Sequence, residues 1–218
     1  MTHKPTIAFA MGDPAGISPE LAARLLGDPE FRDGADIVVF GDERILRRGA
    51  AVAGMALDMD VVPSSTVPRP VAGRPLLVDL ANLAPEDVTP RTATLAGGRF
   101  ATENFRRALE FARSGAADAV FFTPFNKAAM RLAYPGYDDE IRFVRDVLGD
   151  SGPASEFNVL DTLWNARVTS HIPLSEVAAN ITGDRVIRAL TLADASMKAA
   201  GFASPRIAVA GLNPHAGD

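Results

Sequence analysis

The sequence contains no cysteine, only three histidines and a single tryptophan. Without cysteine the chain can form no disulfide, has no thiol nucleophile and cannot build a cysteine-based zinc finger. The apolar run from Ile7 to Met11 is too short for a signal peptide, and no later stretch approaches the length of a membrane span. The net charge of −5, with no basic run, argues against nucleic acid or an anionic membrane as a partner. These absences predict a cytoplasmic protein that binds neither nucleic acid nor membranes.

Short apolar segments alternate with helical patterns along the first two thirds of the chain. The length of 218 residues and the hydrophobic content of 47% fit a folded protein of one or two domains. We expect strands at residues 6–11, 36–41, 58–62, 75–79 and 119–123, and helices at 19–26, 42–53 and 91–114. Ser18 is expected to cap the first helix, with Pro19 as the first helical residue. This alternation predicts a parallel, layered α/β domain.

Charged residues follow two of these strands, at the end where α/β sheets bind ligands. Asp13 lies in the loop 12–16, which is either an anion cradle at a helix start or a fixed turn that carries one exposed carboxylate. Lys127 follows the strand at 119–123 and is either a substrate clamp or a solvated charge at a helix start. The acidic run 138–140 is typical of a helix N-terminus, although it could also hold a metal or a polyhydroxy substrate.

Two of the histidines, His171 and His215, follow segments that resemble strands, at 166–169 and 206–210. A further strand is expected at 156–160, and helices at 174–181 and 184–200. Neutral imidazole suits zinc, nickel and iron, so the pair could form half of a metal site. Spacing alone favours two separate loop histidines, because no helical periodicity ties them together.

Four motifs together resemble the 4-hydroxythreonine-4-phosphate dehydrogenase family: GDPAGISPE at 12–20, TPFNK at 123–127, VTSHIPL at 168–174 and GLNPHAGD at 211–218. The resemblance implies an α/β fold like that of isocitrate and isopropylmalate dehydrogenases, with two α/β/α domains flanking a cleft. We expect the first domain at 1–123 and the second at 124–218. It also implies a homodimer with a shared active site. Because the family continues past the last motif, we expect its C-terminal part, with a third metal-binding histidine and most of the nicotinamide site, to be absent from this chain.

The same resemblance implies a role for particular residues. His171 and His215 match histidines that bind a divalent metal, either zinc, magnesium or cobalt, which overrides the preference from spacing. Lys127 and Asp13 would be catalytic, while Asn126, Tyr137 and Asp138 would contact the small-molecule substrate. The implied reaction is a metal-dependent, NAD- or NADP-linked oxidation, with decarboxylation, of a phosphorylated hydroxy acid, as in pyridoxine biosynthesis.

The stretch 136–140 departs from the family pattern. Where the family has Gly-His-Thr-Glu, this sequence has Gly-Tyr-Asp-Asp-Glu, with one residue inserted. The added acids would repel a phosphate unless the metal or a cation such as Arg142 compensates. This favours a four-carbon aldonate 4-phosphate over 4-hydroxythreonine 4-phosphate as the substrate. Two alternatives stay open: a dehydrogenase of a carboxylated cyclic dihydrodiol, and an inactive truncated fragment that only folds or binds metal.

Overall fold

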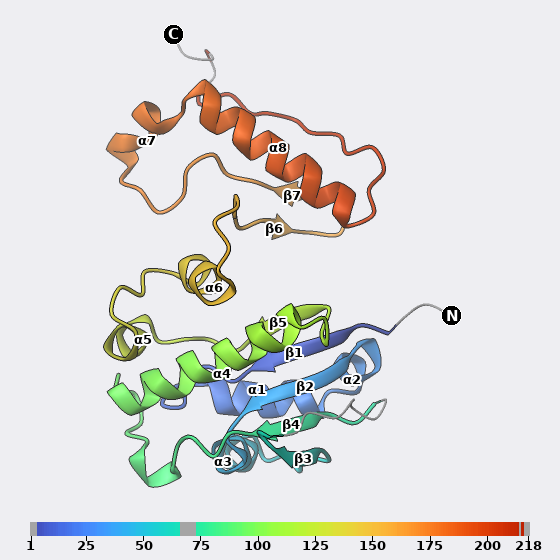
Figure 1. Ribbon diagram of the computed structural model, residues 1–218, viewed down its shortest axis with the longest axis vertical. Helices are drawn as coiled ribbons and strands as arrows, with labels where there is room; N and C mark the ends of the chain where they lie inside the picture. Colours follow the sequence, from blue (N-terminus) through green and yellow to red (C-terminus); the bar gives the residue numbers. More distant parts are fainter. Residues whose placement is uncertain (1–3, 66–72, 214, 216–218) are drawn as a thin grey trace. The chain divides into compact units, whose positions relative to one another are not determined.

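The computed structural model describes residues 4–65, 73–213 and 215. The chain divides into two compact units, Met1–Asp150 and Ser151–Asp218 (Figure 1). Residues 124–150 contain two helices that belong to the first unit and pack on its long helix. The domain boundary expected between residues 123 and 124 stays a prediction.

The first unit is built on a five-stranded sheet with the order β3-β4-β2-β1-β5. Every neighbouring pair in this sheet is parallel, which confirms the predicted α/β class. The strands begin and end within two residues of their predicted positions: β1 (Thr6–Ala10), β2 (Asp36–Gly41), β3 (Asp60–Pro63), β4 (Leu76–Asp79) and β5 (Ala119–Phe122).

Helices cover both faces of the sheet (Figure 1). On one face lie α1 (Ser18–Gly27), α2 (Pro29–Gly34) and α3 (Glu43–Ala53), and on the other α4 (Leu95–Arg113), α5 (Lys127–Ala133) and α6 (Glu140–Leu148). Successive strand residues point to opposite faces, so Phe9 and Val39 join the core under α1 and α3, whereas Ala8 and Phe40 join the core under α4. A short 3₁₀ helix, η1 (Pro85–Asp87), lies in the connection from β4 to α4.

Two expectations for this unit need correction. Helix α2 was not predicted, and only the starts of α5 and α6 were indicated, at Lys127 and at the acidic run 138–140. Each of these helices has fewer than ten residues, so the sequence pattern does not fix its extent. Ser18 was predicted to cap α1, but Ile17 occupies the cap position and no side chain caps the helix. The Ser18 hydroxyl instead accepts a hydrogen bond from the amide of Gly12 at 2.9 Å, because the loop before the helix folds back over it.

The second unit contains a two-stranded antiparallel ladder and two helices. β6 (Asn158–Val159) pairs with β7 (Trp164–Asn165), and α7 (Leu174–Asn180) and α8 (Gly183–Ala199) follow. Both helices lie where the sequence predicts them. The single tryptophan, Trp164, packs against Phe157 and Phe202, with ring centroids 5.8 and 6.0 Å apart.

The strands predicted in the second unit are mostly wrong. The segment 156–160 contributes only the two residues of β6, and neither 166–169 nor 206–210 is a strand. The physical reason is that an apolar sequence becomes a strand only when another backbone pairs with it, and no strand in the described part of the chain pairs with 206–210. Ile207 and Val209 are consequently 41% and 61% exposed.

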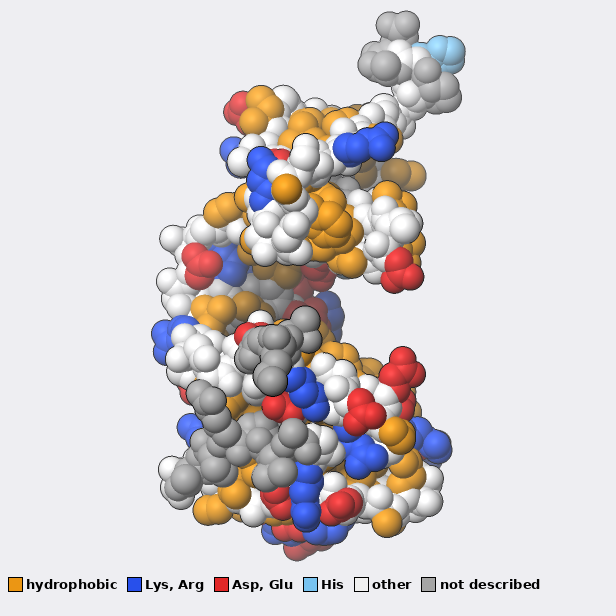
Figure 2. All heavy atoms as spheres, turned by 90° about the vertical axis from the view of Figure 1, so that its right-hand side faces the viewer, with side chains coloured by type: hydrophobic (Ala, Val, Ile, Leu, Met, Phe, Trp, Pro, Cys, Tyr) orange, Lys and Arg blue, Asp and Glu red, His pale blue; other side chains and the backbone are white. Residues whose placement is uncertain are grey.

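Hydrophobic side chains therefore gather on the surface of the second unit, in the upper part of Figure 2. Within this unit a hollow of about 400 Å³ lies among Trp164, Leu190, Ile207 and other apolar side chains. No helix in the described ranges is long and apolar enough to cross a membrane.

Candidate functional site

The loops that follow β1 and β5 meet at one edge of the sheet of the first unit. β1 and β5 are adjacent and parallel, so their carboxyl ends lie side by side. The amide of Asp13 donates to the carbonyl of Pro124 at 2.9 Å, and the side-chain amide of Asn126 lies 3.4 Å from Asp13 Oδ2. Lys127 follows as the first residue of α5. The structure thus gathers three predicted site residues, Asp13, Asn126 and Lys127, from sequence positions more than a hundred residues apart.

The loop that carries Asp13 is a tight turn. Asp13 Oδ1 accepts a hydrogen bond from the amide of Ala15 at 3.0 Å, so part of the carboxylate is used to close the turn. A Cβ atom on Gly12 would lie 2.3 Å from the carbonyl oxygen of Thr123 and 2.4 Å from that of Pro124. Only glycine allows the two loops to approach this closely. The half-buried carboxylate of Asp13 is held at the edge of the sheet by this contact.

Asn126 and Lys127 form the start of α5. Asn126 Oδ1 accepts from the amide of Ala129 at 3.2 Å and caps the helix, while its Nδ2 faces Asp13. The ammonium of Lys127 is half exposed and lies 3.5 Å from the carboxylate of Glu140. Lys127 is therefore a charge at a helix start that also contacts the stretch 136–140. A half-exposed ammonium beside a carboxylate and an amide can bind an anionic substrate or transfer a proton.

Tyr137 is nearly fully buried in this unit, at 3% exposure, and its ring packs against Phe143. Its hydroxyl has no partner in hydrogen-bonding geometry within the described ranges. Burial, and next the carboxylate of Glu140, raise the pKa of the Tyr137 phenol well above its ordinary value. The predicted contact between Tyr137 and substrate stays a prediction.

The acidic run 138–140 is the N-terminus of α6. Asp139 Oδ1 accepts from the amide of Arg142 at 2.8 Å and caps the helix, and Glu140 occupies its first turn. Negative charge at this end is favoured by the helix dipole. Asp138 is exposed beside it, and its predicted substrate contact also stays a prediction.

The two predicted metal ligands belong to the second unit. His171 is exposed, with a left-handed φ of 56°, and His215 is exposed with its amide 3.1 Å from Asn213 Oδ1. Of the GLNPHAGD motif, residues 214 and 216–218 lie outside the described residues. Within the described part of the chain, no three His, Asp or Glu side chains gather as a metal site would require. Two imidazoles are also fewer than the three protein ligands of a catalytic zinc, so His171 and His215 alone do not complete such a site.

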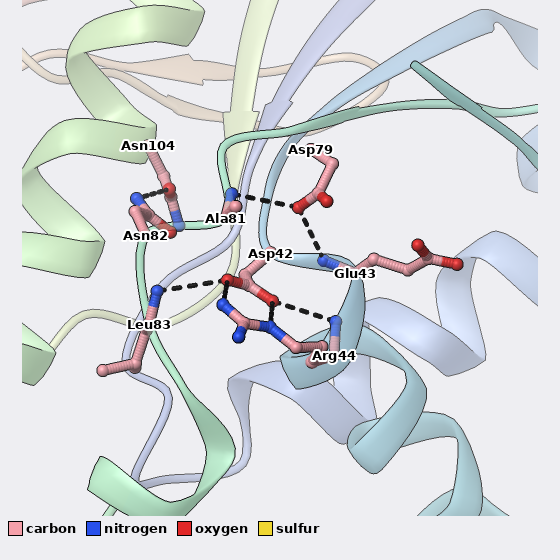
Figure 3. Close-up of polar contacts among 8 residues, drawn as sticks. All are labelled: Asp42, Glu43, Arg44, Asp79, Ala81, Asn82, Leu83 and Asn104. Atoms are coloured by element: carbon pink, nitrogen blue, oxygen red, sulfur yellow. Dashed lines mark hydrogen bonds and ion pairs between the residues drawn. The ribbon is translucent and has the colours of Figure 1, made fainter. Parts of the chain in front are cut away.

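A second polar cluster lies at the carboxyl ends of β2 and β4 (Figure 3). The buried carboxylate of Asp42 accepts from the amides of Arg44 and Leu83, at 2.9 and 3.1 Å, and from the Arg44 guanidinium, at 3.0 and 2.7 Å. Burial alone would raise the pKa of Asp42, but these hydrogen bonds outweigh it and hold the pKa below its ordinary value. Asp79 similarly accepts from the amides of Glu43 and Ala81, each at 3.1 Å. The oxygens that accept these bonds shape the loop after β4, so we assign the cluster a structural role.

Three buried polar residues at the site, Ser18, Asn104 and Thr123, were missed as site residues by sequence reasoning. They are 1%, 0% and 0% exposed. One signal was available for Asn104, which stands four residues after Phe100 and four before Ala108 on the buried face of α4. A polar residue at an apolar helical position indicates a buried hydrogen bond. Ser18 and Thr123 carry no comparable signal, because hydroxyl residues are common at helix starts and strand ends.

A parallel α/β sheet with polar loops at its carboxyl edge defines the class of α/β proteins that bind small molecules at that edge. The model of the family "Pyridoxal phosphate biosynthetic protein PdxA" matches residues 33–218. The chain therefore belongs to the PdxA family, which confirms the resemblance seen in its motifs.

Individual relatives agree with this placement. A protein of Rhizobium meliloti (strain 1021), provisionally named 4-hydroxythreonine-4-phosphate dehydrogenase 2, is 59% identical over 99% of this chain and 62% of its own length. A protein of Symbiobacterium thermophilum, provisionally named D-threonate 4-phosphate dehydrogenase, is 30% identical over the whole chain and 65% of its own length. The chain thus spans less than two thirds of these relatives.

Solved structures of the family share the fold. The crystal structure of 4-hydroxythreonine-4-phosphate dehydrogenase from Klebsiella pneumoniae has a TM-score of 0.85 and 28% identity, over 98% of this chain and 64% of that one. A terephthalate 1,2-cis-dihydrodiol dehydrogenase from Burkholderia xenovorans LB400 has a TM-score of 0.62 and 29% identity, over 99% and 64%. The predicted fold class is confirmed by these matches.

Proposed function

We propose that the protein is a dehydrogenase that oxidises a phosphorylated hydroxy acid with NAD or NADP, in a metal-dependent reaction that ends in decarboxylation. The substrate would be D-threonate 4-phosphate or another four-carbon aldonate 4-phosphate, or 4-hydroxythreonine 4-phosphate. The observation that supports this most directly is the match to the PdxA family over residues 33–218, together with the dehydrogenase names of the relatives. The cytoplasmic location and the homodimer with a shared active site belong to the same proposal.

The site geometry suggests how residues of the first unit would take part. The half-exposed ammonium of Lys127 would bind an anionic oxygen of the substrate or pass a proton to it, with Glu140 keeping the ammonium oriented. Asp13 would accept a hydrogen bond from a substrate hydroxyl through Oδ2, because Oδ1 is engaged by the amide of Ala15. The side-chain amide of Asn126 would help to orient the same group.

The proposed reaction requires a bound divalent metal and a bound nicotinamide nucleotide. His171 and His215 would supply two imidazole ligands, and a divalent metal bound there would act as a Lewis acid on the substrate oxygen. No residue of this chain is assigned to the nucleotide.

The acidic residues beside Lys127 bear on the choice of substrate. Glu140 places negative charge 3.5 Å from the ammonium, and Asp138 and Asp139 directly precede it in the sequence, which disfavours a second phosphate or carboxylate at this point. A dihydrodiol carboxylate carries less charge than a phosphorylated acid. The fold match to the terephthalate dihydrodiol dehydrogenase therefore supports a second candidate, the oxidation of a carboxylated cyclic dihydrodiol.

The experiment is a reduced-nucleotide assay with NAD and NADP, with and without divalent metal. The panel contains 4-hydroxythreonine 4-phosphate, D-threonate 4-phosphate and a carboxylated cis-dihydrodiol. Turnover of a phosphorylated acid supports the first proposal, and turnover of the dihydrodiol alone replaces it with the second. Turnover of neither substrate class, with metal still retained, overturns both and selects the inactive module.

Two variants test the assigned residues against matched controls. Lys127→Met should abolish turnover, whereas Lys198→Met, at an exposed lysine of α8 that pairs with Asp194, should not. His215→Ala should lower the metal content measured by atomic emission, whereas His3→Ala, at the histidine without a predicted role, should not. Unchanged metal content in His215→Ala would remove that residue from the metal site.

A further inference from the structure

The peptide group between Met11 and Gly12, directly before Asp13, is held at both ends by buried side chains. Its carbonyl, on Met11, accepts a hydrogen bond from Asn104 Nδ2 at 3.0 Å. Its N–H, on Gly12, donates to Ser18 Oγ at 2.9 Å and to Thr123 Oγ1 at 3.0 Å. The two hydroxyls also hydrogen-bond to each other at 2.5 Å.

Three separate elements supply these groups. Ser18 begins α1, Asn104 lies in the middle of α4 and Thr123 directly follows β5. All three side chains are at most 1% exposed, so water does not compete for these hydrogen bonds. One peptide plane is therefore fixed relative to two helices and the neighbouring strand.

The next peptide group, between Gly12 and Asp13, is also fixed and links the Met11–Gly12 peptide to the carboxylate of Asp13. The amide of Asp13 donates to the carbonyl of Pro124, directly after Thr123, at 2.9 Å. The Asp13 side chain then lies beside Asn126 in the same loop. Rotation of the Met11–Gly12 peptide would move Asp13 away from Asn126, because only the backbone of Gly12 separates this peptide from Asp13.

We propose that Ser18, Asn104 and Thr123 are positioning residues that orient the Met11–Gly12 peptide and thereby aim the carboxylate of Asp13 at the substrate. The proposal rests on the proposed function for its catalytic consequence, but its structural part does not. Misplacing a reacting group by about 1 Å can cost up to about a hundredfold in rate. The three residues would thus affect turnover without touching the substrate.

The test compares Thr123→Val, which removes the hydroxyl and keeps the branched shape, with Thr123→Ser, which keeps the hydroxyl. The double variant Ser18→Ala/Thr123→Val removes both acceptors of the Gly12 amide. Hydrogen exchange of the amides of Gly12 and Asp13 is measured by NMR on the full 23.0 kDa chain. We expect both amides to exchange at least about tenfold faster in the double variant, because a buried hydrogen bond has been lost. The amides of the buried strand β2 serve as the internal reference and should not change.

The second part of the test measures KM, and kcat normalised to the concentration of folded protein. Thr123→Val should lower kcat about tenfold or more with KM within about twofold of the wild type, and Thr123→Ser should restore kcat to within about twofold. If the wild type has no activity on any substrate, the proposed function fails while the exchange experiment still decides the structural part.

Two results would overturn the proposal. One is unchanged exchange at Gly12 and Asp13 in the double variant, and the other is equally faster exchange throughout β2, which would indicate general destabilisation. If the double variant does not fold, the same comparison between Thr123→Val and Thr123→Ser decides the question.

Discussion

The contact between the loops after β1 and β5 leads to a sharp prediction for Gly12→Ala. The new Cβ would lie 2.3 Å from the carbonyl oxygen of Thr123, whereas ordinary contacts begin at 3.4 Å. The two loops would have to separate by the difference, about 1.1 Å. Such a shift would stretch the 2.9 Å hydrogen bond from Asp13 to Pro124 to about 4 Å and break it.

The expected loss of stability in Gly12→Ala has two sources, the overpacking and the broken hydrogen bond. Overpacking costs about 1–3 kcal/mol, and the lost hydrogen bond about 1 kcal/mol more. The free energy of unfolding should therefore fall by about 2–4 kcal/mol. With a urea dependence of about 2 kcal/mol per M, the midpoint of unfolding should move down by about 1–2 M.

Far-ultraviolet circular dichroism in urea is the appropriate assay, because it follows the helices and strands of the first unit directly, whereas the only tryptophan, Trp164, belongs to the second unit. Gly34→Ala is the matched control, since its Cβ would meet nothing within 4 Å. That variant should leave the midpoint unchanged or raise it slightly. A Gly12→Ala midpoint equal to that of the wild type would refute the reasoning from the loop contact.

Three other predictions concern the first unit. Asp42→Asn should lower the free energy of unfolding by about 3 kcal/mol at neutral pH. Because the folded pKa of Asp42 lies below 3.8, the stability that the ionised carboxylate gives the wild type should be lost as the pH falls below that value. Thermal melts at decreasing pH should therefore show the difference between wild type and variant shrinking in acid. Gly98→Ala places a Cβ 2.0 Å from the carbonyl oxygen of Ala129 and should cost about 1–3 kcal/mol, measured against Gly183→Ala, whose Cβ meets nothing within 4 Å. Tyr137→Phe removes a buried hydroxyl that makes no hydrogen bond of good geometry and interacts with the carboxylate of Glu140, so the free energy of unfolding should change by less than about 1 kcal/mol at pH 7. Because burial raises the folded pKa of this phenol above 10.0, the phenol ionises more readily in the unfolded chain as the pH rises above that value. The wild type should then lose stability relative to the variant, which should melt at a higher temperature in alkaline buffer.

The elements that the sequence predicts well are those whose signals are local. The five strands of the first unit are short apolar runs between turn residues, and such runs are strands wherever a parallel neighbour exists. The same kind of run at 206–210 is not a strand, because pairing depends on another segment and not on the run itself. The extents of helices α5 and α6 were not predicted, because their stabilisation comes from packing on α4 and from the caps Asn126 and Asp139.

The residues of the candidate site also divide into those that local sequence patterns predict and those that they do not. The sequence places Asp13 and Lys127 each after a strand of the parallel sheet, and the contact between Asp13 and Asn126 follows because these two strands are neighbours. The contacts that Thr123 makes with Gly12 and Ser18 are not predictable from local pattern, because these partners lie more than a hundred residues away in the chain. The roles of His171 and His215 rest on the family resemblance.

The hydrogen bonds around Gly12 also have a consequence for folding during synthesis. The amide of Gly12 finds its Thr123 partner 111 residues downstream, and the carbonyl of Met11 finds Asn104 93 residues downstream. A ribosome that adds about 5–20 residues per second needs on the order of ten seconds to deliver that partner. Until then the loop can form only its local hydrogen bonds, from the amide of Gly12 to Ser18 and from the amide of Ala15 to Asp13, although β1 and β2 are already available to pair. The Asp13 loop should therefore be among the last parts of the first unit to order, because non-local contacts form late.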